Sequence, residues 1–204
     1  MNRIFLISPA NCAGKRAQMM VREEAQFELA RRLRTDGATL GEIFTFLSGL
    51  YFRGKLCYAR AFGRTTDGSP GAYIITTNRG LLPPDTMVTL GELRALGSVP
   101  IDARDLRYAE PLRRTAARIA AMPNCEVVLL GSIATGKYVD HLLPMFGERL
   151  RFPAEFVGRG DMSRGGLMLR CVAEAHELDY IPVEGAVRHG ARPPKLAKLA
   201  PAPV

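Results

Sequence analysis

Residues 125–146, CEVVLLGSIATGKYVDHLLPMF, decide the expected fold of this chain. Cys125–Leu130 is a short apolar run rich in β-favouring residues, and Pro123-Asn124 precede it, so it predicts a buried strand. A turn of small residues follows, and apolar side chains then recur at helical spacing as far as Phe146. Strand, Gly-rich turn and helix in this order indicate an α/β protein with a parallel sheet.

The turn at residues 131–137 has the spelling of an anion-binding loop. Gly131, Gly136 and Lys137 match the first seven positions of a P-loop. The eighth position should be Ser or Thr, which would hold magnesium, but it is Tyr138. We therefore expect an anion-binding turn, in which backbone N–H groups and a helix N-terminus face the ligand, rather than an NTPase.

The rest of the chain extends this pattern into one domain. We predict a single α/β domain over residues 1–184, with a mostly parallel sheet flanked by helices and basic Gly-rich turns at the carboxyl ends of the strands. Residues 185–204 read as a basic, Pro-rich tail. The other expected strands are 3–8, 72–77, 151–157 and an edge strand 179–183; the expected helices are 15–34, 39–62 with a break at Gly49 or Gly54, 89–96, 111–121 and 167–177.

Composition and charge restrict the function. The chain has 204 residues, 47% of them hydrophobic, and no apolar run approaches the length of about 20 residues that spans a bilayer. The four cysteines are scattered and only three His occur, so we expect no metal site, no disulfide framework and a cytoplasmic location. The net charge is +8, and residues 1–64 hold 11 Lys/Arg against 5 Asp/Glu. Such a distribution favours a phosphate-bearing partner.

Candidate ligand-binding residues cluster where strands end. In a parallel sheet, ligands bind beyond the carboxyl ends of the strands, and these ends here are rich in Gly, Lys and Arg. Glycine lets a backbone approach the ligand, and the cations neutralise phosphate charge. The predicted phosphate-binding or nucleic-acid-binding residues are Ser8, Asn11, Lys15, Arg16, Asn78, Arg79, Ser132, Gly136, Lys137, Arg159 and Arg164.

One acid stands out as a candidate catalytic group. Asp161 lies between Arg159 and Arg164, where it would stay ionised and could orient a water or stabilise a cationic sugar. A purely structural role as partner of those arginines is an equal alternative. Asp85 and Glu155 rank below it, and His141 is expected to be structural. No cofactor-binding motif is recognised, and whether the chain is an enzyme stays open.

Several short motifs resemble a known family. The stretch Leu6-Ile7-Ser8-Pro9-Ala10 resembles the opening of the peroxide-stress YaaA family, although Asn11 stands where that family has Lys. Residues 50–62 and 164–168 are similar to later motifs of the family, and residues 80–85 resemble a turn in a related group of uncharacterised bacterial domains. The resemblance implies a cytoplasmic, stress-related DNA-binding protein whose basic surface contacts the DNA.

Three functions follow from these observations. The first is a nucleic-acid-binding protein, with DNA preferred, that contacts phosphates through the basic strand-end turns. The second is an enzyme that acts on a nucleotide or a DNA base, such as an N-glycosidic hydrolase that uses Asp161. The third is a binder of a small phosphate compound or nucleotide. The sequence leaves the oligomeric state open.

Overall fold

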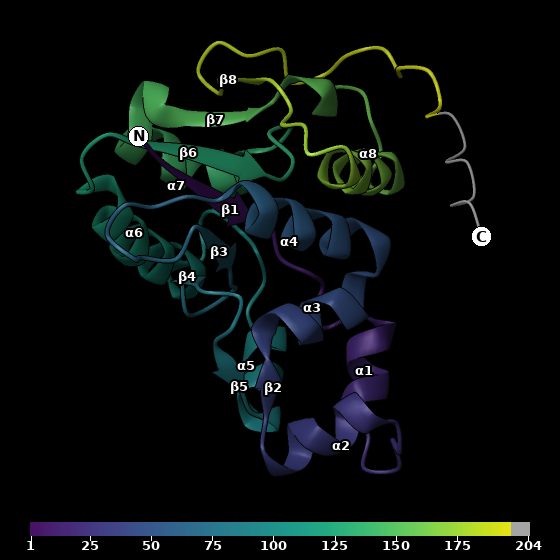
Figure 1. Ribbon diagram of the computed structural model, residues 1–204. Coiled ribbons are helices and arrows are strands. Elements are labelled where there is room, and N and C mark those ends of the chain that lie inside the picture. Colours follow the sequence, from purple (N-terminus) through teal and green to yellow (C-terminus); the bar gives the residue numbers. More distant parts are fainter. Residues whose placement is uncertain (197–204) are drawn as a thin grey trace.

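A six-stranded sheet forms the centre of the molecule. The computed structural model describes residues 1–196, and Figure 1 shows the sheet in the upper part of the molecule, with helices around it. The strand order is β4-β3-β1-β6-β7-β8. Strands β3 (Ala72–Ile75), β1 (Asn2–Ile7), β6 (Cys125–Leu130) and β7 (Leu150–Pro153) are parallel, and the edge strands β4 (Leu81–Leu82) and β8 (Tyr180–Pro182) are antiparallel. The predicted α/β fold with a mostly parallel sheet is confirmed.

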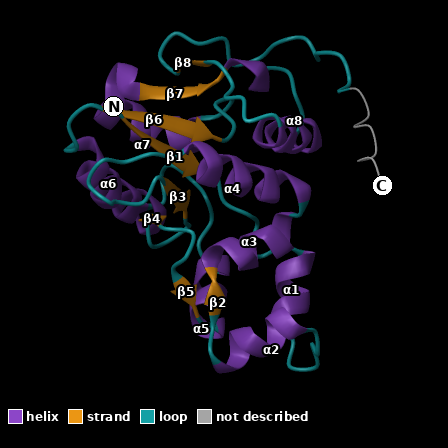
Figure 2. Ribbon diagram, viewed as in Figure 1, coloured by secondary structure: helices purple, strands orange, loops and turns teal. Residues whose placement is uncertain are grey.

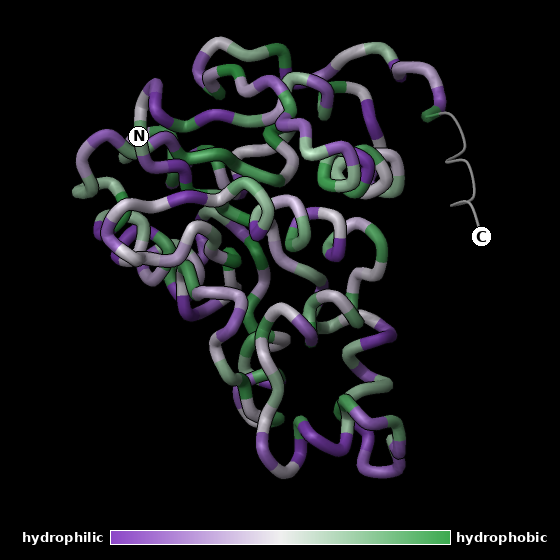
Figure 3. The backbone as a smooth tube through the Cα atoms, viewed as in Figure 1, coloured by the Kyte–Doolittle hydropathy of each residue, from purple (hydrophilic) through white to green (hydrophobic). Residues whose placement is uncertain are grey.

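Helices cover both faces of the sheet, as Figure 2 shows. Successive side chains of a strand point to opposite faces. Phe5 and Ile7 of β1 accordingly belong to a cluster with α4 (Leu50–Phe62) and α8 (Asp161–Ala173). Ile4 and Leu6 pack instead with α6 (Leu106–Ala120) and α7 (Gly136–Phe146). All six residues of β6 are buried, and this strand is correspondingly hydrophobic in Figure 3.

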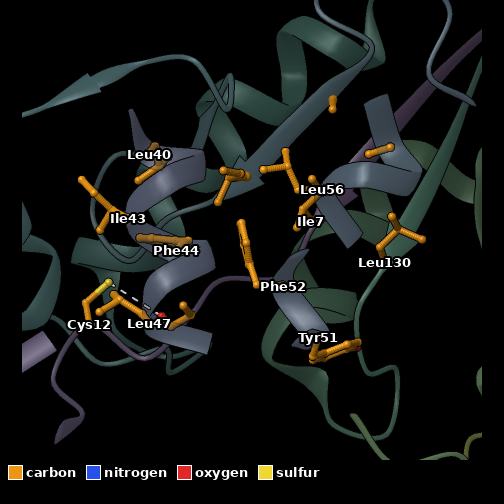
Figure 4. Packing of buried hydrophobic residues seen from close by; sticks show 14 of the residues in the cluster. Ile7, Cys12, Leu40, Ile43, Phe44, Leu47, Tyr51, Phe52, Leu56 and Leu130 are labelled. Carbon is orange, nitrogen blue, oxygen red and sulfur yellow. Dashed lines mark hydrogen bonds between the residues drawn. The ribbon is translucent and has the colours of Figure 1, made fainter. Parts of the chain in front are cut away.

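A smaller group of elements extends from the sheet towards the lower part of Figure 1. It contains α1 (Lys15–Val21), α2 (Glu28–Thr35), α3 (Leu40–Ser48), α5 (Leu90–Gly97) and the antiparallel pair β2 (Ala38–Thr39) and β5 (Met87–Val88). Figure 4 shows Phe44 of α3 and Phe52 of α4 side by side, with ring centroids 5.4 Å apart. The core is therefore continuous from the sheet into this part.

The local signals in the sequence predict several helix boundaries correctly. Thr39 begins α3 with the expected capping box, in which its hydroxyl accepts the N–H of Glu42 and its own N–H donates to the Glu42 carboxylate. Gly37, with φ +84°, follows the end of α2, and Gly49, with φ +63°, separates α3 from α4. Both positions need the left-handed backbone that glycine adopts without strain.

The predicted helix over 15–34 is wrong: it is two helices. Arg22 has an extended backbone, and Phe27 leaves the helical path to stack on Phe46 at 5.0 Å between centroids. The Arg34 guanidinium donates to the carbonyl oxygens of Arg22 and Ala25, at 3.1 and 2.6 Å, and so satisfies backbone acceptors released by the break. Because no Gly or Pro marks the break, local sequence does not reveal it.

Two other predicted helices start too late. The helix expected over 111–121 begins at Leu106, because Asp105 provides the N-cap by accepting the N–H of Arg107 at 3.0 Å. The helix expected over 167–177 is α8, which begins at Asp161 and ends at Ala173. The Gly-rich spelling suggested a loop there, whereas Gly165 allows a close contact between helices. Leu81–Leu82, within the stretch that resembles a turn, pairs with β3 as the short strand β4.

Only the first part of the expected tail, residues 185–196, belongs to the described residues. Gly190 and Ala191 lie against Val157 and Gly158, so this part of the tail follows the protein surface. Residues 197–204 of the predicted tail lie outside the described part.

Candidate functional site

A buried lysine lies on the inner face of α4. Lys55 is four residues after Tyr51 and three after Phe52, so its side chain shares their face of the helix. That face packs on β1, and Lys55 is only 1% exposed. Lysine is among the residues that are least often fully buried, because an ammonium group loses its hydration.

The closest contacts of the Lys55 amine are with Ser8, which directly follows β1, and with aromatic rings. Its Nζ donates to the Ser8 carbonyl oxygen at 2.6 Å and contacts Ser8 Oγ at 2.7 Å. It also lies 4.2 Å from the centroid of the Tyr51 ring, a cation–π distance. Among residues 1–196, no carboxylate lies within ion-pair distance of it. Burial lowers the pKa of Lys55 to about 7.

Charges from α7 and α8 surround this amine. The Asp161 carboxylate opposes the effect of burial and raises the pKa of Lys55, whereas Lys137 and Arg164 lower it further. One acid thus faces three basic groups, each of which belongs to a different helix. This excess of positive charge favours an anionic ligand, because an anion would neutralise it.

A close crossing of α4 and α8 places these groups together. A Cβ on Gly54 would lie 2.6 Å from the Gly165 carbonyl oxygen, and a Cβ on Gly165 would lie 2.9 Å from the Leu50 carbonyl oxygen. Only glycines permit this approach. Asp161 and Arg164 lie in the first turns of α8, so the crossing carries them to the α4 residues Tyr51 and Lys55.

The Tyr51 hydroxyl is a buried polar atom whose hydrogen bonding is incomplete. Tyr51 is 8% exposed, and within the described part of the chain its Oη makes no well-formed hydrogen bond, although the Arg164 guanidinium and the Ser8 hydroxyl lie beside it. Burial raises the pKa of Tyr51, while the nearby Arg164 guanidinium acts in the opposite direction. Buried hydroxyls normally find a partner, so this one is available to a ligand. We call Ser8, Tyr51, Lys55, Lys137, Asp161 and Arg164 the lysine site.

A cavity of about 540 Å³ adjoins the lysine site, with which it shares Lys137. It lies at the carboxyl ends of β1 and β3, and its lining includes Asn11, Thr77 and the loop that follows α5. Its size is that of small-molecule sites. Cys12 also lines it, but burial raises the pKa of this thiol to about 12, so the thiol stays protonated and unreactive. Tyr138, another lining residue, is 3% exposed.

The structure brings four of the predicted residues together. Ser8, Lys137, Asp161 and Arg164 belong to the lysine site, and Asn11 lines the adjoining cavity. Arg164 is held in position by its guanidinium, which donates to the Phe156 carbonyl oxygen at 2.8 Å and lies over the Phe156 ring. The prediction that strand ends from distant segments contribute to one place therefore holds for β1, β6 and the segment after β7.

The other predicted residues have local structural contacts. Arg79 pairs with Glu92 at 2.8 Å, and the Asn78 amide donates to the Ala95 carbonyl oxygen. Gly136 begins α7, but the Asp140 carboxylate lies against it, so this helix N-terminus already faces an acid. Of the remaining four, Arg16 donates to the Phe46 carbonyl oxygen and Arg159 donates to Ser163. Ser132 accepts the Ala134 N–H, and Lys15 is exposed at the start of α1.

The lower-ranked candidates lie outside the lysine site. Asp85 pairs with Arg60 on the surface. His141 accepts a hydrogen bond from Arg113 at 3.2 Å, and burial lowers its pKa, which favours the neutral ring expected of a structural histidine. In residues 1–196 no group of three or more His, Cys, Asp or Glu side chains is arranged to hold a metal ion.

Sequence reasoning missed Lys55 and Tyr51, although a signal was present. Residues 51–64 interleave aromatic and basic side chains, and a stretch of this kind usually packs its rings inward and leaves its cations in solvent. Helical spacing contradicts this for Lys55, which falls on the same stripe as Tyr51, Tyr58 and Ala59. A lysine in the middle of an apolar stripe was the available clue.

Comparison of the chain with protein-family models, with curated proteins and with solved structures finds no match. The resemblance to the YaaA family therefore stays a prediction. Across residues 1–196, no helix combines the length and the hydrophobicity needed to cross a membrane.

Proposed function

We propose that this protein binds a nucleotide unit of a DNA strand, and that it does so through the phosphate at the lysine site. The observation that carries the proposal is the buried Lys55, which has no carboxylate within ion-pair distance among the described residues and has Lys137 and Arg164 around it. A phosphate would neutralise the positive charge that Lys137 and Arg164 bring to the site, and the Lys55 amine can donate an N–H to it in either protonation state.

The cavity next to the lysine site supports a nucleotide rather than a bare phosphate. A phosphate between Lys55 and Lys137 would leave the sugar or base next to the cavity that Lys137 also lines. Asn11 and Thr77 are polar groups in that lining, surrounded by apolar ones. Further phosphates of a strand would meet the cations that are concentrated in residues 1–64.

Fluorescence anisotropy with a labelled single-stranded DNA oligonucleotide at several salt concentrations tests the proposal. Phosphate contacts release counterions, so the logarithm of the binding constant should fall linearly with the logarithm of the salt concentration. In the double variant Lys137→Gln/Arg164→Gln we expect weaker binding and a slope reduced by about 1.4, since each lost contact with a single strand contributes about 0.7.

The matched control removes two charges elsewhere. Arg114 and Arg118 are exposed on α6, and Arg114→Gln/Arg118→Gln should leave the salt dependence close to that of the wild type. Competition by a mononucleotide and by inorganic phosphate separates the ligand sources: a strand binder is displaced poorly by both, and a mononucleotide binder is displaced by the free nucleotide. Equal losses in both double variants, or binding indifferent to salt, would refute the proposal.

A further inference from the structure

We propose that Ser8 and Lys55 form a nucleophile–base pair that cleaves a phosphate ester bound at the lysine site. This inference rests on the proposed function for its substrate class. The two side chains have the geometry that such a pair requires, because Nζ and Ser8 Oγ are 2.7 Å apart. A nucleophile and its base must lie within hydrogen-bond reach, and a third group must orient the base. The Ser8 carbonyl oxygen, 2.6 Å from Nζ, is that third group.

The protonation state of Lys55 suits a base. With its pKa at about 7, a large share of the amine is neutral in neutral solution. A neutral amine donates one N–H to the Ser8 carbonyl oxygen and directs its lone pair at the Ser8 hydroxyl. The chain contains 5 Lys against 23 Arg, yet the buried position holds Lys. Arginine is always charged and could not accept the proton.

Groups around the pair can stabilise the negative charge that develops during the reaction. The Tyr51 hydroxyl, which makes no well-formed hydrogen bond among the described residues, and the Arg164 guanidinium lie beside each other, and Lys137 adds a second cation. Donors held in place before the reaction contribute most of the electrostatic stabilisation in many enzymes. Gly131 is required here as well: a Cβ at this position would lie 2.9 Å from the Ser8 Cβ.

The reaction balances within this set of residues and water. Lys55 takes the proton of the Ser8 hydroxyl as Oγ forms a bond to phosphorus, and the bond from phosphorus to the leaving alcohol oxygen breaks. The Lys55 ammonium returns the proton to that oxygen. A water oxygen then bonds to phosphorus as Lys55 takes a proton from that water, the bond from phosphorus to Ser8 Oγ breaks, and the Lys55 ammonium returns the proton to Oγ as the phosphate product leaves. No oxidant or reductant takes part.

Diisopropyl fluorophosphate, a phosphorus electrophile that reacts with activated serines, tests the pair directly. We expect intact-mass and peptide mass spectrometry to find one adduct, on Ser8, and none in Ser8→Ala. In Lys55→Met the labelling rate should fall by at least about 100-fold, the usual contribution of a general base. Ser69, a partly exposed loop residue, is the control: Ser69→Ala should be labelled like the wild type.

A second measurement keeps the test valid if Lys55→Met does not fold. In the wild type the labelling rate should rise with pH, reach half its maximum at about pH 7 and level off about one pH unit higher, as Lys55 loses its proton. The other titratable or polar groups that face Nζ are Ser8, Tyr51, Lys137, Asp161 and Arg164. A folded protein that binds the oligonucleotide but shows no Ser8 adduct would overturn the catalytic pair and leave the proposed function intact. Labelling of Ser8 that is independent of pH would overturn it too.

Discussion

Lys55 illustrates how a single residue can combine structural and functional roles. Its amine joins α4 to the end of β1 through Ser8, and its stem packs in the apolar core. Burial of a charged amine with no carboxylate within ion-pair distance is unfavourable. This unfavourable free energy appears as a lowered pKa of Lys55. A residue of this kind, beside a cavity, is a candidate for function on physical grounds.

The lowered pKa predicts how stability depends on pH. The folded amine has a pKa of about 7 and the ordinary value is 10.5, so between these values the unfolded chain binds more protons. The free energy of unfolding of the wild type should therefore rise with pH through this window, relative to Lys55→Met, by up to about 1.4 kcal/mol per pH unit. Below about pH 7 the difference should be constant.

Urea denaturation of both proteins at about pH 6, 8 and 9 measures this difference. Cysteine and tyrosine side chains titrate in both proteins and cancel in the comparison. Lys195→Met, which removes an exposed lysine, should run parallel to the wild type at every pH. If the stability of Lys55→Met also changes with pH in parallel with that of the wild type, the pKa of the Lys55 amine is not lowered and our interpretation of the site's electrostatics is wrong.

At the scale of elements, the contact between α4 and α8 positions the lysine site. Two neighbouring glycines of α8, Gly165 and Gly166, differ in how much space surrounds them. A Cβ on Gly165 would lie 2.9 Å from both the Leu50 carbonyl oxygen and the Tyr51 Cα, whereas a Cβ on Gly166 would meet only Leu196, at an ordinary 3.6 Å. Both residues are inside the helix, so the pair separates packing from helix propensity.

We expect Gly165→Ala to destabilise the protein and Gly166→Ala to stabilise it. Alanine gains up to about 1 kcal/mol over glycine inside a helix. At Gly165 the helices must move apart, and overpacking of this kind costs about 1–3 kcal/mol. Urea midpoints of the two variants provide the measurement. A stabilised Gly165→Ala would mean that the crossing tolerates a methyl group and does not fix the site.

The elements also show where local reasoning works. Thr39 and Thr89 both begin helices with capping boxes, because the whole motif lies within four residues. The break after α1 depends on Arg34 and Phe46, which lie far from Arg22 in the sequence. A sequence pattern of a few consecutive residues does not include contact partners that are so far away in the sequence.

For the whole molecule, an ion-pair network ties the sheet together across its strands. Glu126 of β6 accepts Arg3 of β1 at 2.6 Å and pairs with Arg151 of β7 at 3.1 Å. Arg3 and Arg64 also pair with Glu177, which precedes β8. The Glu126 side chain is only 8% exposed, so water does not replace its partners easily.

Glu126→Gln should lower the free energy of unfolding by about 2 kcal/mol. Removal of one partner from a fully buried pair costs about 3–5 kcal/mol, and the partial exposure of Arg3 and Arg151 reduces this figure. Glu148→Gln, an exposed position with no ion pair among the described residues, should change stability by less than about 0.5 kcal/mol. Equal effects of the two variants in urea denaturation would show that the network contributes nothing.

The sequence by itself determined the class of the fold. Apolar runs such as Cys125–Leu130 and the glycines that stop helices act locally, and their periodicity specifies strands, helices and a parallel sheet. It also placed Ser8, Lys137, Asp161 and Arg164 among the candidates, because cations and polar groups at strand ends are visible in one dimension. The tertiary structure alone decided that these residues meet around Lys55, while Arg79 pairs with Glu92. The reason is physical: burial and the sum of nearby charges depend on a helix crossing between Gly54 and Gly165, residues that the sequence separates by more than half the chain.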